Sequence, residues 1–172
     1  MVLFPPGKGG GDDVAHGYKG KGVTIHLIVD GEGMPIAEST TAANQSERDE
    51  VIDLLNGAKV NCGAGRPKSC PKELQGDKGY DSQALRNEIR RKGVRPIIPR
   101  REYKDRKPRL GRKPPNLIDR FKVERCFSWL QRKFRRLCIK WERRRAFWNG
   151  FLKLGIAWMW LERLIKLESV SG

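Results

Sequence analysis

The sequence predicts an α/β domain, in which helices pack on a sheet of short strands. Three observations support this class. Runs of β-branched and apolar residues alternate along the chain with segments whose apolar residues recur at helical spacing. A length of 172 residues fits a single domain with one core. A hydrophobic fraction of 38% is enough to fill that core, although 33% of the residues are charged.

The first elements form a predicted β-hairpin. Residues 5–22 are rich in glycine and are expected to be a mobile loop that leads into the first strand, rather than a packed element. Residues 23–29 (VTIHLIV) and 35–41 (PIAESTT) have the composition of strands. Asp30 is followed directly by a glycine, which is typical of the tight turn of a hairpin. We therefore interpret Asp30 as a turn residue.

A helix follows the hairpin. Ser46 is its predicted N-cap, and the acidic residues that come next suit the positive end of a helix. Val51, Leu54 and Leu55 share one face, so this helix is expected to pack on the sheet and to end near Asn56.

A second strand–helix–strand unit comes next. Residues 72–77 (KELQGD) predict a short strand that ends at Asp77. Asp81 is the predicted N-cap of the next helix, which Gly93 terminates. Residues 95–99 (RPIIP) predict a further short strand, which completes the alternation of an α/β sheet.

A basic linker and a long helix follow. Residues 100–118 place prolines among many cations and predict a flexible connection. Residues 119–143 predict a helix, because apolar residues recur at alternating spacings of four and three. The residues expected to face the core are Val123, Phe127, Leu130, Phe134, Leu137 and Trp141.

The last predicted helix covers residues 146–167, so the domain as a whole is expected to span 23–167. Its expected core-facing residues are Phe147, Phe151, Leu154, Trp158, Leu161 and Ile165. Trp148, Trp158 and Trp160 allow a second interpretation, a set of rings that stack on nucleobases. Aromatic residues at helical spacing more often belong to a core, and we favour that interpretation.

The positive charge of the chain is concentrated in one region. The net charge is +16, and residues 86–145 contain 24 Lys and Arg against 6 Asp and Glu, a local net charge of +18. Such a block attracts a polyanion, since each neutralised phosphate releases condensed counterions. Five prolines interrupt the block, which argues against an amphipathic helix on a membrane surface. No stretch reaches the roughly 20 apolar residues of a membrane span. The expected partner is nucleic acid, and the expected location is the cytoplasm.

Two carboxylates are the candidate catalytic residues. Phosphodiesters can be cut and joined by two divalent ions that carboxylates from distant sequence positions hold close together. Asp77 ends a predicted strand, the usual place for ligands in α/β sheets, and Gly79 permits close approach of the backbone. Glu124 is a solitary carboxylate in a helix dense with cations. Each also has an ordinary explanation: Asp77 as a turn residue, and Glu124 as the partner of Arg120 in a surface salt bridge.

Two segments carry a resemblance to a family. The runs GDKGYDSQALRNEIRRKGVRPIIPRR and DRFKVERCFSWLQRKFRRLCIKWER resemble the catalytic domain of bacterial insertion-sequence transposases of the insertion sequence five group, which are DDE transposases. The resemblance implies a ribonuclease-H-like (retroviral-integrase-like) mixed sheet with flanking helices. It also implies DNA strand cleavage and transfer that depend on Mg²⁺, with Mn²⁺ as a possible substitute, in a homo-oligomer. Asp77 and Glu124 correspond to the second Asp and the final Glu of the triad.

The chain departs from the family pattern at three places. Leu117 stands where the family commonly has Tyr, and Gln131 where it has Lys or Arg. The first Asp of the triad lies in relatives on a strand just before the glycine-rich loop, so it is expected to fall before Met1, and the first strand with it. The cations expected to contact DNA are Arg120, Arg125, Arg132, Lys133, Arg135 and Arg136.

Three functions remain open at this stage. The leading one is DNA transposition chemistry, incomplete or inactive in this chain by itself. The second is a DNA-binding module or inhibitor without catalysis. The third, an RNA-binding protein, depends on the charge alone and predicts no dependence on metal.

Overall fold

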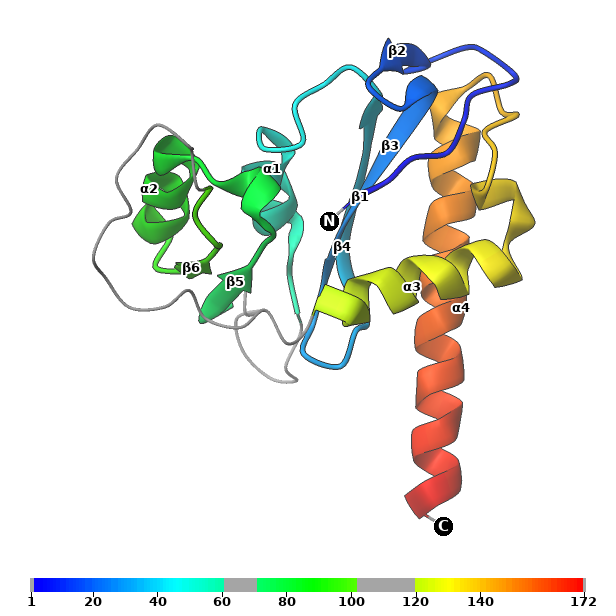
Figure 1. Ribbon diagram of the computed structural model, residues 1–172. Helices are drawn as coiled ribbons and strands as arrows, with labels where there is room; N and C mark the ends of the chain where they lie inside the picture. Colours follow the sequence, from blue (N-terminus) through cyan, green and yellow to red (C-terminus); the bar gives the residue numbers. More distant parts are fainter. Residues whose placement is uncertain (1, 61–70, 102–119, 172) are drawn as a thin grey trace.

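The computed structural model describes residues 2–60, 71–101 and 120–171. An antiparallel sheet is centred on β3, which pairs with three other strands (Figure 1). Its partner β4 is joined to it by a hairpin, while β1 and β2 pair with shorter stretches. The bounds are β1 Val2–Leu3, β2 Ala15–Gly17, β3 Gly20–Val29 and β4 Pro35–Ala42.

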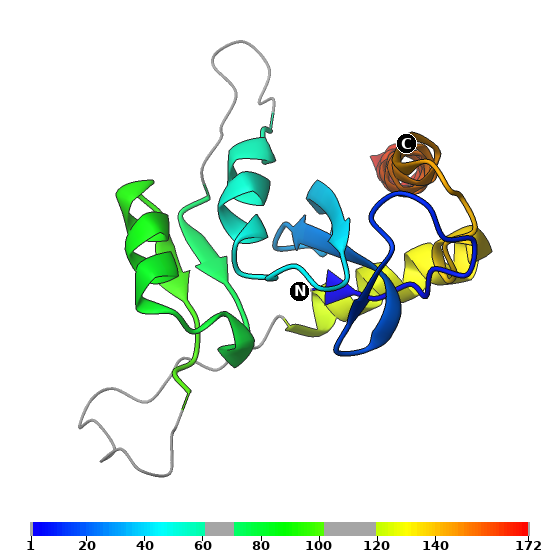
Figure 2. The ribbon, with the colours of Figure 1, turned by 90° about the horizontal axis from the view of Figure 1, so that it is seen from above.

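A second, smaller sheet lies beside the first. Strands β5 (Glu73–Gln75) and β6 (Arg95–Ile97) pair in parallel and are joined by the 3₁₀ turn η1 (Lys78–Tyr80) and helix α2 (Gln83–Arg91). Helix α1 (Glu50–Gly57) lies between the two sheets (Figures 1 and 2). The described residues therefore form a mixed α/β structure, as predicted, with strands and helices in the predicted order.

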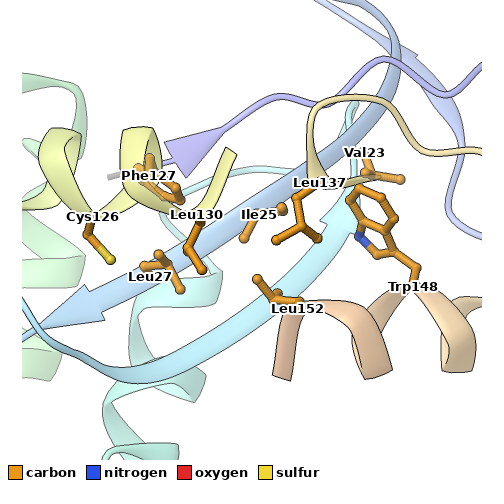
Figure 3. Packing of buried hydrophobic residues seen from close by; sticks show 9 residues of the cluster. All are labelled: Val23, Ile25, Leu27, Cys126, Phe127, Leu130, Leu137, Trp148 and Leu152. Carbon is orange, nitrogen blue, oxygen red and sulfur yellow. The ribbon is translucent and has the colours of Figure 1, made fainter. Parts of the chain in front are cut away.

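One face of β3 carries the main core. Helix α3 (Arg120–Lys133), the 3₁₀ turn η2 (Arg135–Leu137) and helix α4 (Arg145–Ser171) pack against it (Figures 1 and 3). The residues of this core are Val23, Ile25, Leu27, Cys126, Phe127, Leu130, Leu137, Trp148 and Leu152, all at most 4% exposed. Alternation of side chains along β3 explains why its odd-numbered residues face the helices.

The predicted hairpin is confirmed. The register pairs Ile25 with Thr40 and Leu27 with Glu38. The Asp30 carboxylate accepts hydrogen bonds from the backbone N–H groups of Glu32 and Met34, both at 2.9 Å. Asp30 is therefore the turn residue that the sequence predicted, because its side chain closes the turn on itself.

The glycine-rich segment is packed, so the expectation of a mobile loop over 5–22 is wrong. Within it β2 pairs with β3. The backbone N–H groups of Gly7 and Gly9 donate to the backbone carbonyls of Lys21 and Lys140, respectively. A Cβ atom at Gly9 would lie 2.0 Å from the carbonyl oxygen of Trp141. Glycine is therefore needed here for close contact between two backbones, which is a different use from loop flexibility.

Two helices begin later than predicted. Helix α1 starts at Glu50, and Ser46 lies in the turn before it, where its carbonyl accepts a bond from the N–H of Asp49. Helix α2 has Ser82 as its N-cap, with Oγ accepting from the N–H of Leu85. Asp81 does not cap α2, because its carboxylate pairs with Arg86 at 2.7 Å.

The predicted helix over 119–143 is wrong beyond Lys133. Helix α3 ends there, Phe134 leaves the helical conformation, and η2 follows. This bend still buries Leu137, while Trp141 is 56% exposed instead of in the core. Leu137 therefore reaches the core through the turn η2, and not as part of one continuous helix. The expected linker 100–118 lies outside the described residues apart from its first two positions.

The expected core-facing stripe of the last helix is also wrong, except for Phe151, which is partly buried against the main core. In α4 the buried residues are Trp148, Leu152 and Gly155, whereas Phe147 is 61% and Trp158 47% exposed. A Cβ atom at Gly155 would lie 3.2 Å from side-chain carbons of Leu130 and Phe134, so glycine lets α4 approach α3 closely. None of the described helices is long and apolar enough to cross a membrane.

Candidate active site

Asp77 lies at the end of the β5 arm and caps the turn that follows. Its backbone is extended, and its Oδ1 accepts a hydrogen bond from the N–H of Gly79 at 2.7 Å. A Cβ atom at Gly79 would lie 2.8 Å from the same oxygen, so a larger residue here would displace the Asp77 carboxylate. The strand was predicted to end at Asp77, but β5 ends at Gln75, so Asp77 follows the strand by two residues.

Glu124 lies in the second turn of α3 and is exposed. The next residues, Cys126 and Phe127, point into the main core and fix the orientation of this part of the helix (Figure 3). On the neighbouring side, Lys122 donates a hydrogen bond to the carbonyl of Gly31 in the hairpin turn. The first turns of α3 therefore lie next to the hairpin turn that follows β3.

Asp77 and the first turns of α3 border one cavity. The cavity has a volume of about 390 Å³ and lies between β3 and β5. Asp77 lines it from one side, and Lys122 and Val123, the two residues before Glu124, line it from the other. Asp77 therefore lies at the cavity itself. Glu124 lies on the helical turn that borders the cavity.

Comparisons with known proteins identify the family of the chain. A family model described as the transposase DDE domain matches residues 5–160, which include both carboxylates. The chain belongs to the transposase DDE domain family. A protein described as a putative transposase for insertion sequence element IS402, from Burkholderia cepacia, is 34% identical over 142 residues, which cover 80% of this chain. The chain spans 64% of that relative's length. No solved structure matches the chain.

DDE transposase domains generally use divalent metal ions. Asp77 and Glu124 are hard oxygen donors of the kind that Mg²⁺ and Mn²⁺ prefer. Within the described ranges, however, no three His, Cys, Asp or Glu residues are grouped so that they could hold a metal ion. The described residues therefore do not by themselves complete a two-ion site.

Other acidic residues near the amino-terminal end are engaged elsewhere. Asp13 forms an ion pair with the guanidinium of Arg145, and Asp12 accepts a hydrogen bond from the backbone N–H of Arg145 at 3.0 Å. Asp30 lines the cavity, but its Oδ1 closes the hairpin turn. Of these three, only Asp30 lines the cavity beside Asp77.

Five of the six predicted DNA-contacting cations have described side chains, and all five are exposed. Lys133 pairs with Glu162 and Arg136 with Glu142, each at 2.8 Å. Within the described part of the chain, no carboxylate pairs with Arg132 or Arg135. These two guanidinium groups are consequently the most available to an incoming phosphate. Arg120 begins α3.

Sequence reasoning missed the residues that hold the Asp77 turn in place. Arg48 donates through Nε to the carbonyl of Gly79 at 2.8 Å, and buried Tyr80 lies near Glu47, with 3.5 Å between Oη and Oε2. Burial and the nearby carboxylate raise the pKa of Tyr80 above its usual value. These pairs join residues more than 30 positions apart, so no local pattern could have indicated them.

A second positioning contact lies behind the same turn. The buried guanidinium of Arg86 donates to Asp81 and, at 2.7 Å, to the carbonyl of Ile98. Although partial burial opposes the charge, the N–H of Arg101 and the guanidinium of Arg86 keep the pKa of Asp81 below its usual value. Arg86 therefore joins α2, η1 and the end of β6 into one unit behind Asp77.

Proposed function

We propose that this DDE domain cuts and joins DNA strands in the transposition of an insertion sequence of the insertion sequence five group, with a ribonuclease-H-like arrangement of its sheet. One observation carries the proposal. Asp77 and the turn of α3 that bears Glu124 border a single cavity, although Asp77 and Glu124 lie 47 positions apart in the sequence. Metal-assisted phosphodiester chemistry requires carboxylates from separate elements near one place, and here Asp77 lines the cavity while Glu124 follows directly after two residues that line it.

In this proposal Asp77 and Glu124 are ligands of Mg²⁺, with Mn²⁺ as a substitute. Such an ion, when bound, supplies activation of an attacking oxygen and stabilisation of a leaving one. Two carboxylates provide few of the oxygen ligands that such an ion takes, so we expect an ion held by Asp77 and Glu124 alone to bind weakly and to support no measurable cutting of DNA.

DNA is the proposed substrate, and the cations of α3 and η2 are its proposed contacts. Arg125, Arg132, Lys133, Arg135 and Arg136 lie on consecutive turns that continue from Glu124. Phosphate contacts of this kind position a protein without reading bases. A complete assembly is expected to be a homo-oligomer that acts in the cytoplasm.

Ion binding provides the first test. Mn²⁺ binding to the purified chain is measured by electron paramagnetic resonance for the wild type, Asp77→Asn, Glu124→Gln and, as a matched control, Asp53→Asn, which changes an exposed carboxylate on α1. The proposal expects each of the first two changes to weaken binding by at least about tenfold, or roughly 1.4 kcal/mol, and the control to leave it unchanged. Equal affinity in all four proteins would contradict it.

A non-catalytic DNA-binding module is the second candidate, and the exposed cations favour it independently of the carboxylates. The same variants separate the two. If Asp77→Asn and Glu124→Gln leave both ion binding and DNA binding intact, the DNA-binding module is the better account. If ion binding is lost and DNA binding persists, the carboxylates form the metal site of a DNA-cutting domain.

A further inference from the structure

An apolar stripe runs along α4 outside the main core. Its spacing alternates between four and three residues once the partly buried Phe151 is included. The five exposed members form the α4 stripe, each 47–61% exposed, and they are Phe147, Leu154, Trp158, Leu161 and Ile165. At about 100° per residue, this stripe lies roughly a third of a turn away from the side on which α4 buries Trp148 and Leu152. Helix α4 therefore has two apolar faces, and only one of them is covered within the described residues.

The spacing indicates that another helix covers the α4 stripe. A helix that packs on a globular core needs a broad apolar face, whereas strict alternation of four and three residues produces the narrow seam along which two helices pack. The stripe runs for ~27 Å, from Phe147 to Ile165 at 1.5 Å per residue. Its later part lies where α4 projects beyond the sheet and α3, so a second helix has access to it (Figure 1).

We propose that the α4 stripe is an interface between two copies of this chain, in which the two α4 helices pack antiparallel about a twofold axis. Both copies contribute the same surface, so the contact closes on itself and stops at a dimer. The proposal gives the expected homo-oligomer a defined surface. It does not rest on the catalytic proposal, because the association is measured without metal or DNA.

The size of the α4 stripe fits a dimer that forms reversibly. Half of a large apolar side chain corresponds to about 100 Å² of surface, so the five side chains from each of two copies would bury on the order of 1,000 Å². That area lies at the lower limit of specific protein interfaces. We therefore expect association at protein concentrations on the order of 10–100 μM.

Burial of the α4 stripe requires little desolvation of polar groups. The indole N–H of Trp158 already donates to Glu162 at 2.8 Å, and Glu162 pairs with Lys133 at the same distance. The ring of Trp158 can therefore enter an apolar contact with its one donor bonded. A stacking surface for nucleobases is less well supported. Trp148 is fully buried, and Trp160 is partly buried with its N–H bonded to the first carbonyl of β4.

Charged residues beside the α4 stripe favour the antiparallel direction. Glu168 continues the alternation three residues after Ile165, so in a parallel pair it would face its own counterpart. An antiparallel pair can instead place Ile165 opposite Leu154. Glu168 then lies beside Lys153 of the second copy, and both side chains are exposed in a single copy. Like charges oppose the parallel arrangement, and opposite charges favour the antiparallel one.

Sedimentation equilibrium of the full 172-residue chain tests the interface. Leu161→Asp places a charge in the middle of the stripe. Leu167→Asp is the matched control, since Leu167 is similarly exposed and lies about 200° around the helix from Ile165. We expect a monomer–dimer equilibrium in the wild type, a dissociation constant raised at least about tenfold in Leu161→Asp, and little change in the control. Urea denaturation of dilute, monomeric protein should be nearly the same in all three, because both leucines are exposed in a single copy.

A charge exchange tests the direction of packing. Lys153→Glu should weaken the dimer a few-fold, and the double variant with Glu168→Lys should restore it, because the pair is formed again with its signs reversed. A double variant as weak as Lys153→Glu would overturn the antiparallel arrangement. A wild type that stays monomeric throughout the concentration range, association beyond two copies, or an equal dimer in Leu161→Asp would overturn the proposal and assign the α4 stripe to another occupant.

Discussion

Strand β3 has two flanks, the face that packs on α3 and α4 and the side that looks toward β5, and the two differ in how completely other residues cover them. Toward α3 and α4, the side chains of Val23, Ile25 and Leu27 are at most 2% exposed and belong to one continuous core. Toward β5, the same strand borders a cavity of about 390 Å³ and an edge that β1 covers only in part. The difference separates two roles. The covered flank stabilises the domain, and the open flank, where Asp77 lies, is available to ligands.

The largest expected effect is on the covered flank. Trp148 is fully buried against β3, so Trp148→Ala should lower the free energy of unfolding by about 3–5 kcal/mol. Trp158 is 47% exposed ten residues later in α4, and Trp158→Ala should cost less than about 1.5 kcal/mol. Urea denaturation of both variants measures the difference. Equal losses would mean that the two faces of α4 are packed alike.

A smaller effect is expected at His26, which is buried where the two flanks meet. Burial lowers the pKa of His26 from 6.5 to about 4, and its Nε2 lies 2.7 Å from Thr41 Oγ1. Between these two pH values the unfolded chain binds a proton that the folded chain does not. Stability should therefore rise with pH across this window and fall as the pH drops toward 4, by on the order of 3 kcal/mol.

The matched variant for this prediction is His26→Gln, which keeps a polar partner for Thr41 and removes the titration. Unfolding by urea at several pH values should show a flatter dependence between pH 4 and 6.5 than in the wild type. An unchanged slope would assign the acid sensitivity to other groups.

The smallest expected effect concerns the exposed cations of α3 and η2. Arg135→Ala should weaken DNA binding a few-fold for all sequences alike and reduce the slope of log affinity against log salt by about 0.9. Arg95→Ala is the control, because Arg95 is an exposed cation on β6 that pairs with Glu73. Fluorescence anisotropy at several salt concentrations measures both. A slope that changes equally in the two variants would remove α3 and η2 as the DNA-contacting surface.

The comparison of flanks also explains how far the sequence could lead. The hairpin, the strand before Asp77 and the order of elements could be predicted, because strand alternation and turn residues are local signals. Which face of α4 packs against the core could not be predicted. Apolar residues occur on several of its faces, so periodicity alone did not distinguish Trp148 and Leu152 from Phe147 and Phe151. The contact with α3 through Gly155 determines which face of α4 is buried, and that contact joins residues far apart in the sequence.

The candidate site shows the same division. Asp77 and Glu124 could be chosen from residue type, position in their elements and the family resemblance. The residues that hold the Asp77 turn, Arg48 and Tyr80, act through contacts with elements far away in the sequence, and no spacing rule identifies them. The cavity itself is a property of two sheets placed side by side, which became visible only in the structure.

The most direct test of the account is to locate the bound ion. Fe²⁺ replaces Mg²⁺ at such sites and, with ascorbate and peroxide, cuts the backbone nearest to it. We expect two cuts in the wild-type chain, one between Gly76 and Gly79 and one between Val123 and Arg125, and the loss of both in Asp77→Asn. Cuts near Asp12 and Asp13, or cuts that persist in Asp77→Asn, would show that the ion lies elsewhere and that the cavity between β3 and β5 is not the reaction site.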